Sequence, residues 1–522
     1  MFDYVVVGAG SAGCVLANRL SADGKSTVAL IEAGPPKHRS FKVRAPGLYQ
    51  LLWRTPLDWA FSTVPQAHGD QRRHFWPRGK VLGGTSCLNA MVYIRGNRAN
   101  YDGWGMPGWS YADVLPYFLR SEDNARGASE YHGAGGPLAV SDHEPSPFAK
   151  AFVEATAARC NVRVTDDFNG AEQEGAGCYQ VTFRNGVRAS TAVAFLDPVR
   201  DRKNLTVITD ALATSLVLDG TRVTGVKIRT RGGEQTIEGR ELVVAGGAIG
   251  SPHLLLLSGI GPAAELVAAG VEARHELPGV GKHLEDHLLA GVKFESPTSR
   301  KLGIPSLLAW MARHAFGASG PLARAPVDAG AFVRSSSAAV LPDIQFHVTP
   351  FGVMLPTDEK TPPPYGRYAS ICPGLIYPRS HGEVRLHSAD PTEAPEIDPR
   401  YFADPADLDH LVTGVKLARE IAATAPLAGI LGREVFPGPA VASDDELRAS
   451  VRATCNTIFH PTGTCKMGTD PLAVVDPQLR VHGLEGLRVV DASILPRIIG
   501  GNTNAPVIMI AEKAADLILE AR

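Results

Sequence analysis

The hydrophobic pattern at the start of the chain predicts a strand, a turn and a helix. Residues 4–7 (YVVV) form a continuous apolar run, which is typical of a strand buried on both faces of a parallel sheet. Glycines interrupt the run from residue 8, and residues 11–20 then favour a helix. Residues 26–34 (STVALIEAG) predict the next strand, so the order of elements is that of an α/β unit.

Similar patterns return further along the chain. Apolar runs predict strands at 205–209, 223–230 and 241–247. Apolar residues at helical spacing predict helices over 406–424 and 506–520. The second helix is apolar on all sides over its first two turns, so we expect it to be buried.

The composition limits the classes of protein to which the chain can belong. The chain has 522 residues, of which 44% are hydrophobic, and this favours a large core and two domains. A net charge of -2 gives no electrostatic footprint for nucleic acid. Seven scattered cysteines, an odd number, disfavour a disulfide framework and favour a reducing compartment.

We expect no targeting segment and no transmembrane segment. The first apolar run lacks a basic flank and ends at Gly8, which is too early for a signal peptide. No uninterrupted apolar stretch is long enough to cross a bilayer. The sequence therefore predicts a soluble, cytoplasmic protein and leaves peripheral contact with a membrane open.

A glycine motif at the first turn predicts a dinucleotide site. Gly8, Gly10 and Gly13 have the spacing G-x-G-x-x-G, which allows a tight turn, a close approach to pyrophosphate and close packing of helix and strand. Glu32 ends the second strand about 20 residues later, where a ribose-binding carboxylate is expected. The alternative is a glycine-rich turn that binds nothing. These residues alone do not separate FAD from NAD.

Further motifs resemble one enzyme family. A glycine pair with hydroxyl residues lies in residues 79–102, and a second glycine-rich segment covers 247–261. Together with the first turn, HPTGTCKMG (460–468) and GGNTNAPVIMIAEKAAD (500–516), they are similar in order and placement to the glucose–methanol–choline (GMC) oxidoreductases. The resemblance runs from Phe2 to about Ala515, and it implies a two-domain, FAD-dependent enzyme that oxidises alcohols.

The resemblance also implies the cofactor contacts. The ADP half would be held by Gly8, Gly10, Ser11, Ala12, Gly13, Glu32 and Ala33, with Ala213 at the adenine. The pyrophosphate and flavin would lie beside Arg78, Val81, Gly83, Gly84, Thr85, Asn89, Ala90 and Val92, and the ribityl chain beside Asp491 and Ala492. Some members attach FAD through a histidine at the position of Leu88 here, so we predict a non-covalent flavin.

His460 has three interpretations. A zinc site with Cys455 and Cys465 would lack a fourth ligand and a recognised spacing. The second interpretation is a structural role, which is the usual one for any single histidine among the sixteen of the chain. The resemblance instead implies a base over flavin N5: neutral His460 takes the hydroxyl proton, the α-hydrogen leaves as hydride, and Asn504 binds the developing alkoxide. We predict the third role and no metal.

The substrate pocket is less well defined by the sequence. Phe459 precedes the base and is a candidate pocket residue or a core aromatic, and His347 is a second candidate. The substrate-domain segments show no aromatic clustering, which disfavours a cage for choline. We therefore expect a primary alcohol (aromatic, furanic or aliphatic) as small-molecule partner, oxidised to the aldehyde, with the acid as a further product in some members.

Other activities stay open. The electron acceptor is O2 or a quinone or dye, so oxidase and dehydrogenase are not separated. A choline dehydrogenase-like enzyme is the first alternative, and a GMC-fold hydroxynitrile lyase is a remote one. A nicotinamide-dependent reductase is disfavoured because the chain has a single G-x-G-x-x-G.

The motifs also predict the domain organisation. They fall into three blocks, so the FAD-binding domain should be discontinuous: residues 1–155, 205–295 and 455–522. Residues 156–204 and 296–454 should form the substrate-binding domain. The expected fold class is α/β and α+β: a Rossmann-type domain beside a mainly antiparallel sheet with helices.

Overall fold

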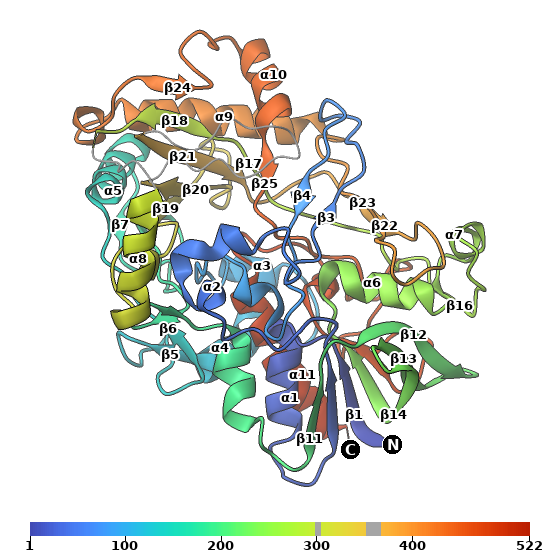
Figure 1. Cartoon of the computed structure of the whole chain (residues 1–522). Helices are drawn as coiled ribbons and strands as arrows, with labels where there is room; N and C mark the ends of the chain where they lie inside the picture. Colours follow the sequence, from blue (N-terminus) through green and yellow to red (C-terminus); the bar gives the residue numbers. More distant parts are fainter. Residues whose placement is uncertain (298–303, 351–366, 522) are drawn as a thin grey trace.

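The computed structural model describes residues 1–297, 304–350 and 367–521, and they form two sheets with helices packed around them (Figure 1). The first sheet has seven strands within these residues, and β1 and β14 lie at its centre. Its strands, from one edge to the other, are β11 (Leu205–Ile208), β2 (Val28–Ile31), β1 (Phe2–Val7), β14 (Gly233–Val244), β13 (Arg222–Thr230) and β12 (Leu212–Asp219), with β26 (Leu487–Val489) beside β14.

The core of this sheet is parallel, as the continuous apolar runs predict. Strand β1 pairs in parallel with β2 and β14, β2 pairs with β11, and β14 pairs with β26, whereas β12 and β13 form an antiparallel extension. Val5, Val6 and Leu30 have no exposed surface, because helices cover the parallel strands. The Rossmann-type part of the expected fold class is confirmed.

Helices α1 (Ser11–Leu20) and α11 (Asn504–Glu520) lie side by side against this sheet (Figure 1). Glu512 of α11 is fully buried and accepts two hydrogen bonds from Arg19 of α1, at 2.7 and 2.8 Å. Arg120, in α4 (Tyr111–Ser121), also pairs with Glu512 at 2.8 Å. The buried charge is therefore matched, and the N-termini of both helices keep a fixed relation.

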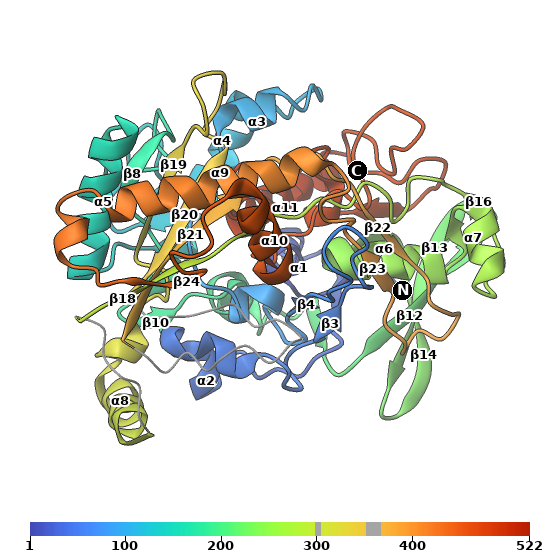
Figure 2. The same cartoon turned by 90° about the horizontal axis from the view of Figure 1, so that it is seen from above.

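The second sheet has nine strands within the described residues and is antiparallel except for the pair β7–β8. Helices α5 (Pro147–Cys160) and α9 (Pro405–Ala422) pack on it, and α9 runs across it in the view from above (Figure 2). Its strands are β24 (Glu434–Phe436), β18 (Val292–Glu295), β21 (Tyr368–Leu375), β20 (Ile344–Thr349), β19 (Ala329–Val333), β8 (Gly175–Cys178), β7 (Val164–Thr165), β17 (Leu288–Leu289) and β25 (Asn456–Thr457).

Smaller elements connect the two sheets. The remaining α-helices are α2 (Phe41–Arg44), α3 (Arg98–Asp102), α6 (Gly247–Leu257), α7 (Ala263–Ala268), α8 (Ile304–Gly317) and α10 (Asp444–Thr454). Two-stranded ribbons are formed by β3 (Phe61–Ser62) with β4 (Phe75–Trp76), β5 (Glu122–Asn124) with β6 (Leu138–Val140), β9 (Phe183–Arg184) with β10 (Val187–Arg188), β15 (Ile260–Gly261) with β16 (His275–Glu276), and β22 (Glu383–Arg385) with β23 (Glu396–Asp398). No helix of the described residues is long and apolar enough to cross a membrane.

The two large sheets group some segments differently from the expected domain boundaries. The boundary at residue 155 falls inside α5, which packs on β8 and β19 of the second sheet. Strands β17, β18 and β25 also belong to the second sheet, although they lie in blocks assigned to the FAD-binding domain. We therefore propose that the chain passes to the second domain at about residue 147 and again at about 288, and leaves it after β25.

The first and third glycines of the motif are required by backbone packing. A Cβ at Gly13 would lie 1.8 Å from the carbonyl oxygen of Gly8, so α1 can approach β1 only because residue 13 has no side chain. Gly8 has φ +104°, and a Cβ there would lie 2.4 Å from the carbonyl oxygen of Ala245. Both contacts are with backbone atoms, which cannot rotate away.

We predict that Gly13→Ala lowers the free energy of unfolding by about 2 kcal/mol or more, because overpacking against backbone forces α1 away from the sheet. Gly429→Ala is the control, since a Cβ there meets no atom within 4 Å. Thermal unfolding followed by circular dichroism checks this. Equal unfolding temperatures for the two variants would contradict the packing argument.

Candidate active site

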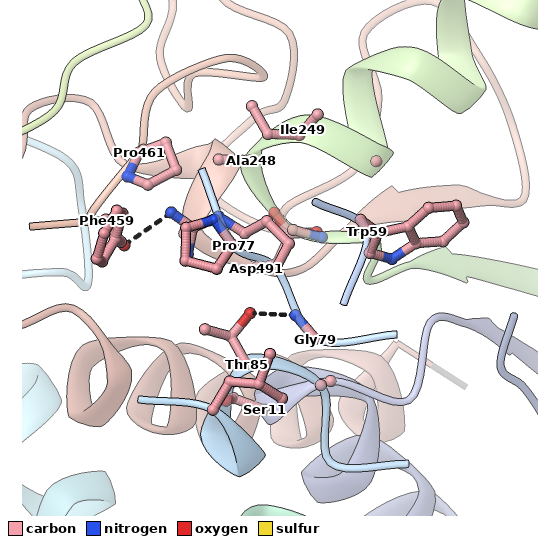
Figure 3. Close-up of a pocket in the computed structure, with 18 of the residues that line it drawn as sticks. Ser11, Trp59, Pro77, Gly79, Thr85, Ala248, Ile249, Phe459, Pro461 and Asp491 are labelled. Atoms are coloured by element: carbon pink, nitrogen blue, oxygen red, sulfur yellow. Dashed lines mark hydrogen bonds between the residues drawn. The ribbon is translucent and has the colours of Figure 1, made fainter. Parts of the chain in front are cut away.

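A cavity of about 590 Å³ is lined by the turn after β1 and by Leu289, His347, Thr349 and Cys372 of the second sheet. Its wall is assembled from distant parts of the chain: the N-terminus of α1, the 3-10 turn η2 (Gly84–Cys87), the start of α6, residues 458–461, and the N-terminus of α11. In Figure 3, Ser11 and Thr85 lie on one side of the space and Ala248 and Ile249 of α6 on the other. The wall therefore joins all five segments that carry the sequence motifs.

Two helix N-termini line the cavity. Ser11 and Ala12 begin α1, Thr503 is the N-cap of α11 and Asn504 its first residue, and all four line the space. The Ser11 hydroxyl donates to Asn504 Oδ1 at 2.7 Å and so ties the two ends together. The positive ends of both helix dipoles favour an anionic ligand, such as a pyrophosphate or a reduced flavin.

The motif glycines leave room for such a ligand. No atom lies within 4 Å of a Cβ built on Gly10, so the backbone there faces open space. A Cβ on Gly84 would lie 2.7 Å from the Gly10 Cα, so the glycine pair and the first turn meet backbone to backbone. The two turns together form a groove lined by glycine backbone, which a diphosphate can approach closely.

Glu32 lines the cavity beside the first turn. Its carboxylate accepts hydrogen bonds from the N–H groups of Ala9 (2.9 Å) and Gly34 (2.8 Å). Burial raises the pKa of Glu32 to about 7, against the opposing effect of those two hydrogen bonds. A hydroxyl pair from a ribose would supply further donors to this carboxylate, as sequence position alone suggested.

Asp491 is a second buried carboxylate in the wall. It accepts hydrogen bonds from Gly247 N (2.8 Å), Ser251 Oγ (2.5 Å) and Ser493 N (2.8 Å). These bonds hold the start of α6 against η7 (Ala492–Ile494). The pKa of Asp491 is nevertheless raised, because burial outweighs its hydrogen bonds.

Most of the residues predicted to bind cofactor line the cavity. They are Gly8, Gly10, Ser11, Ala12, Glu32, Ala33, Arg78, Gly84, Thr85, Asn89, Ala90, Val92, Ala213, Asp491 and Ala492. Gly13, Val81 and Gly83 lie behind the wall instead, where Gly13 permits helix packing and Gly83 N donates to Ala9 O at 2.7 Å. These contacts, the two helix N-termini and the open groove fit an FAD molecule.

His460 lies in the cavity wall and forms a hydrogen-bonded chain with a second histidine. His460 Nδ1 is 3.0 Å from His287 Nδ1, and His287 Nε2 is 3.1 Å from the carbonyl oxygen of Ile376. The His287 Nε2 must carry the proton, because a carbonyl oxygen only accepts. Burial lowers the pKa of His287 to about 3, so the ring is neutral and its Nδ1 is an acceptor.

This chain determines the tautomer of His460. Since His287 Nδ1 accepts, His460 Nδ1 must donate, and a neutral His460 then has its lone pair on Nε2. The pKa of His460 is well below its usual value, first because of burial and then because of His287, His347 and Arg78. His460 is therefore a neutral base at pH 7 with a defined basic atom.

The carboxamide beside that atom belongs to Asn502. Its Nδ2 lies 3.3 Å from His460 Nε2, and Asn502 also lines the cavity. The predicted pairing of His460 with Asn504 is not present, because Asn504 is the first residue of α11 and its Oδ1 accepts from Ser11. Asn502 precedes the helix and so turns toward the second sheet.

Asp286 positions the backbone of the His460 segment. It accepts hydrogen bonds from His460 N at 2.8 Å and from the hydroxyls of Thr457 and Tyr401, both at 2.5 Å. Phe459 has φ +68°, a left-handed conformation that is rare for a bulky residue. Its carbonyl accepts from Arg78 at 2.8 Å, and its N–H donates to Thr457 Oγ1 at 2.7 Å, so bonds on both sides hold the strained residue.

Aromatic side chains form the wall near His460. Trp53 packs edge to face on Phe459, with ring centroids 5.6 Å apart, and on Tyr49 at 5.3 Å. All three line the cavity, as does His347, whose pKa burial lowers to about 4. The sequence identified Phe459 and His347 as candidates but missed Trp53, Tyr49, Asn502 and the supporting His287 and Asp286.

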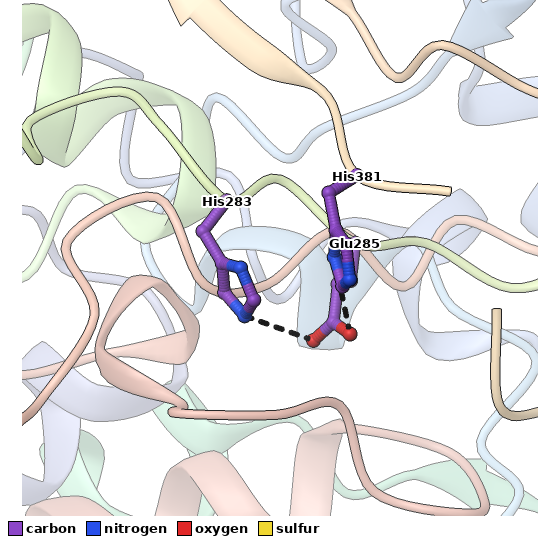
Figure 4. A group of neighbouring side chains, drawn as sticks. All are labelled: His283, Glu285 and His381. Carbon is purple, nitrogen blue, oxygen red and sulfur yellow. Dashed lines mark ion pairs between the residues drawn. The ribbon is translucent and has the colours of Figure 1, made fainter. Parts of the chain in front are cut away.

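Neither of two histidine groups has metal-site geometry. Cys455, His460 and Cys465 do not form a converging ligand group in the described part of the chain. His283, Glu285 and His381 do lie close together (Figure 4). The His283 and His381 rings stack at 4.5 Å with planes 19° apart, so their in-plane lone pairs run nearly parallel and do not meet at one ion.

The second group instead holds the loop before Asn502. Glu285 Oε2 accepts from Ile498 N at 2.7 Å, and His283 Nε2 lies 3.0 Å from the carbonyl oxygen of Pro496. Glu285, Asp286 and His287 are consecutive. One short segment thus contacts both the Asn502 loop and the His460 loop.

Comparisons with known proteins agree with this architecture. Models of the GMC oxidoreductase family match residues 2–289 and 378–511. The chain is 44% identical to "Alcohol dehydrogenase [acceptor]" of Pseudomonas putida, covering 99% of this chain and 96% of that protein. It is 42% identical to the mitochondrial choline dehydrogenase of Homo sapiens, covering 99% and 89%.

A solved structure shares the whole fold. Pyridoxine 4-oxidase from Mesorbium loti superposes with a TM-score of 0.90 at 34% identity, covering 100% of this chain and 99% of the other. A fungal aryl-alcohol oxidase has a TM-score of 0.84 at 24% identity, which supports the fold alone. The family matches extend over more than half of the chain, and they include most of the cavity wall, both helix N-termini and His460, whereas Val327, His347, Thr349 and Cys372 of the wall lie between the two matches. The chain belongs to the FAD-dependent GMC oxidoreductase family.

Proposed function

We propose that the protein oxidises primary alcohols to aldehydes, with His460 as the base that removes the hydroxyl proton. The observation that carries the proposal is the unprotonated Nε2 of a neutral His460, beside Asn502 in the wall of a cavity that fits FAD. When bound, FAD supplies the acceptor for the hydride that leaves the alcohol carbon. The residues of the chain bind the alcohol, take its proton and stabilise the charge that develops.

Proton transfer follows from the geometry around His460. An alcohol hydroxyl beside Nε2 replaces the long 3.3 Å contact with Asn502: it donates to Nε2 and accepts an N–H from Asn502 Nδ2. As the proton moves, the Asn502 N–H stabilises the alkoxide without competing for the proton. We therefore assign to Asn502 the role that the sequence suggested for Asn504.

The positive end of α11 supports hydride transfer to a flavin. Thr503, Asn504 and Val507 of this helix terminus line the cavity, and Asn504 is fixed by Ser11. A flavin gains negative charge on reduction, so an adjacent helix N-terminus favours the reduced form. Half-buried Arg78, whose pKa burial lowers to about 10, adds positive charge in the same wall.

A neutral alcohol fits the site better than a cation. Arg78 interacts with His460 electrostatically, and it would oppose a quaternary ammonium. Trp53, Tyr49 and Phe459 offer an aromatic wall that suits an aromatic, furanic or aliphatic alcohol. The same wall could face an ammonium group, and relatives named choline dehydrogenase are 41–42% identical, so a choline-oxidising enzyme is the second candidate.

Several finer properties belong to the proposal. FAD is expected to bind non-covalently, since Leu88 lines the cavity where a linking residue would stand, so acid precipitation should release the yellow colour.

All seven cysteines are free, which suits the cytoplasm. The final acceptor is O2 or a quinone or dye; peroxide formation in air with benzyl alcohol separates the two.

Anaerobic titration of the flavin-loaded protein with alcohols tests the proposal. Bleaching of the flavin by benzyl alcohol or hydroxymethylfurfural, faster than by choline, is the expected result. Bleaching by choline alone would favour the second candidate. No bleaching by any alcohol, with cyanide released from mandelonitrile, would contradict oxidation and indicate a lyase.

We predict that His460→Ala retains flavin but reduces it with alcohol at least about 100-fold more slowly, since general base catalysis is lost. Stopped-flow absorbance under anaerobic conditions measures the rate. The control is His410→Ala, which removes a half-buried histidine of α9 outside the cavity wall. A His460→Ala rate close to that of the control would show that another group takes the proton.

We predict different defects for the two asparagines. Asn502→Leu removes the donor beside His460 and should slow flavin reduction by about 10-fold or more. Asn504→Leu removes the acceptor of the Ser11 hydroxyl and should mainly weaken FAD retention. The rate of flavin reduction and the flavin content, measured for both variants, distinguish the two roles. A larger rate loss for Asn504→Leu, at full flavin content, would restore the role to Asn504.

A further inference from the structure

Two segments of the chain are basic and contain no acidic residue. Residues 33–57 hold five Lys and Arg and no Asp or Glu, and residues 296–327 hold four and none. In the whole chain, Asp and Glu number 54 in 522 residues, and the net charge is -2. A general basic character of the protein therefore does not explain the two segments.

The fold brings the described parts of these segments together. Phe41 of α2 contacts His314 of α8, with ring centroids 5.6 Å apart, and the pKa of His314 is lowered by burial and by Arg44. Leu307 and Trp310 of α8 pack with Phe41 in one apolar cluster. Both views show α8 at the periphery of the molecule, on the same side as α2 (Figures 1 and 2).

The outward face of α8 is apolar. The exposed positions of the helix include Leu308, Ala309, Ala312, Arg313, Ala315 and Phe316, and they repeat at helical spacing. Leu308 is 61% exposed and Phe316 is 94% exposed. A globular protein in water gains nothing from an exposed apolar helix face, so such a face marks a contact with another surface.

Exposed basic side chains lie on α8 and on α2, which packs against it. Lys42 and Arg44 of α2 and Arg313 of α8 are exposed, and none forms an ion pair with another described residue. We define the α2–α8 patch as Lys42, Arg44, Leu308, Arg313 and Phe316. An exposed apolar helix face with unpaired positive charge on the same helix and on the helix packed against it complements the interface of a bilayer with anionic headgroups.

We propose that the α2–α8 patch docks the protein on the surface of a membrane that contains anionic lipids. Leu308 and Phe316 enter the interfacial region, and Lys42, Arg44 and Arg313 face the headgroups. The segment 33–57, which contains Lys42 and Arg44, also supplies Tyr49 and Trp53 to the cavity wall. Docking through the patch would therefore place this wall close to the bilayer. An apolar alcohol or a quinone dissolved in the membrane would then have a short path to the site.

Co-sedimentation with lipid vesicles tests the proposal on the full-length, flavin-loaded protein. Phosphatidylcholine vesicles with phosphatidylglycerol should bind the protein at low ionic strength, and binding should fall as salt is added. Vesicles of phosphatidylcholine alone should bind it much less. Protein that stays in the supernatant with both kinds of vesicle overturns the proposal.

Two patch variants separate its charge from its apolar part. Lys42→Glu/Arg44→Glu/Arg313→Glu and Leu308→Ser/Phe316→Ser should each lower the partition coefficient by about tenfold or more. The matched controls are Lys25→Glu/Lys203→Glu and Val340→Ser, which change exposed residues elsewhere on the surface. All variants should keep their unfolding temperature and their activity with a water-soluble alcohol and a dye.

Two further outcomes would also overturn the proposal. Patch variants that bind anionic vesicles as tightly as the wild type overturn the proposal. The wild type could instead fail to bind vesicles and sediment as a dimer, while the patch variants sediment as monomers. The patch would then be a contact between copies of the chain, and the lipid assignment would be wrong.

Discussion

The hydrogen-bond chain from the Ile376 carbonyl through His287 to His460 determines the chemistry of the site. Each link has one permitted direction, because a carbonyl oxygen cannot donate and a ring buried as deeply as His287 is neutral. The lone pair of His460 is therefore confined to Nε2, beside Asn502 in the cavity wall. A base with the other tautomer would direct an N–H at the alcohol and could not take its proton.

Sheet pairing assembles this chain. Leu288 pairs with Thr457 and Leu289 with Asn456, so β17 and β25 lie antiparallel and His287 comes beside Ile458, whose N–H donates to the His287 carbonyl at 3.1 Å. Two strands of only two residues each thus bring the two histidines into register. The groove proposed for FAD and His460, the proposed base, then share one wall, because the chain after β25 returns toward α11 and the first sheet.

Local motifs in the sequence located most of the residues of the cavity wall, but they named only His460 of the pair proposed here, His460 and Asn502. The roles of Gly8, Gly10 and Gly13 depend on a single turn and its neighbours, and their spacing contains that information. The segment Asn502-Thr503-Asn504 has two asparagines, and which one faces His460 depends on α11 beginning at residue 504. His287 carried no motif signal, because its partner is 173 positions away and the pairing of β17 with β25 is not encoded locally.

The protonation state of the His460 ring is the most direct test of this account. Nitrogen-15 NMR of histidine-labelled, flavin-loaded protein, with His460→Gln to assign the signals, reports each ring nitrogen separately. The account predicts a protonated Nδ1 and an unprotonated Nε2 for His460 at neutral pH, and loss of this tautomer preference in His287→Phe. A doubly protonated ring, or a proton on Nε2, would contradict it.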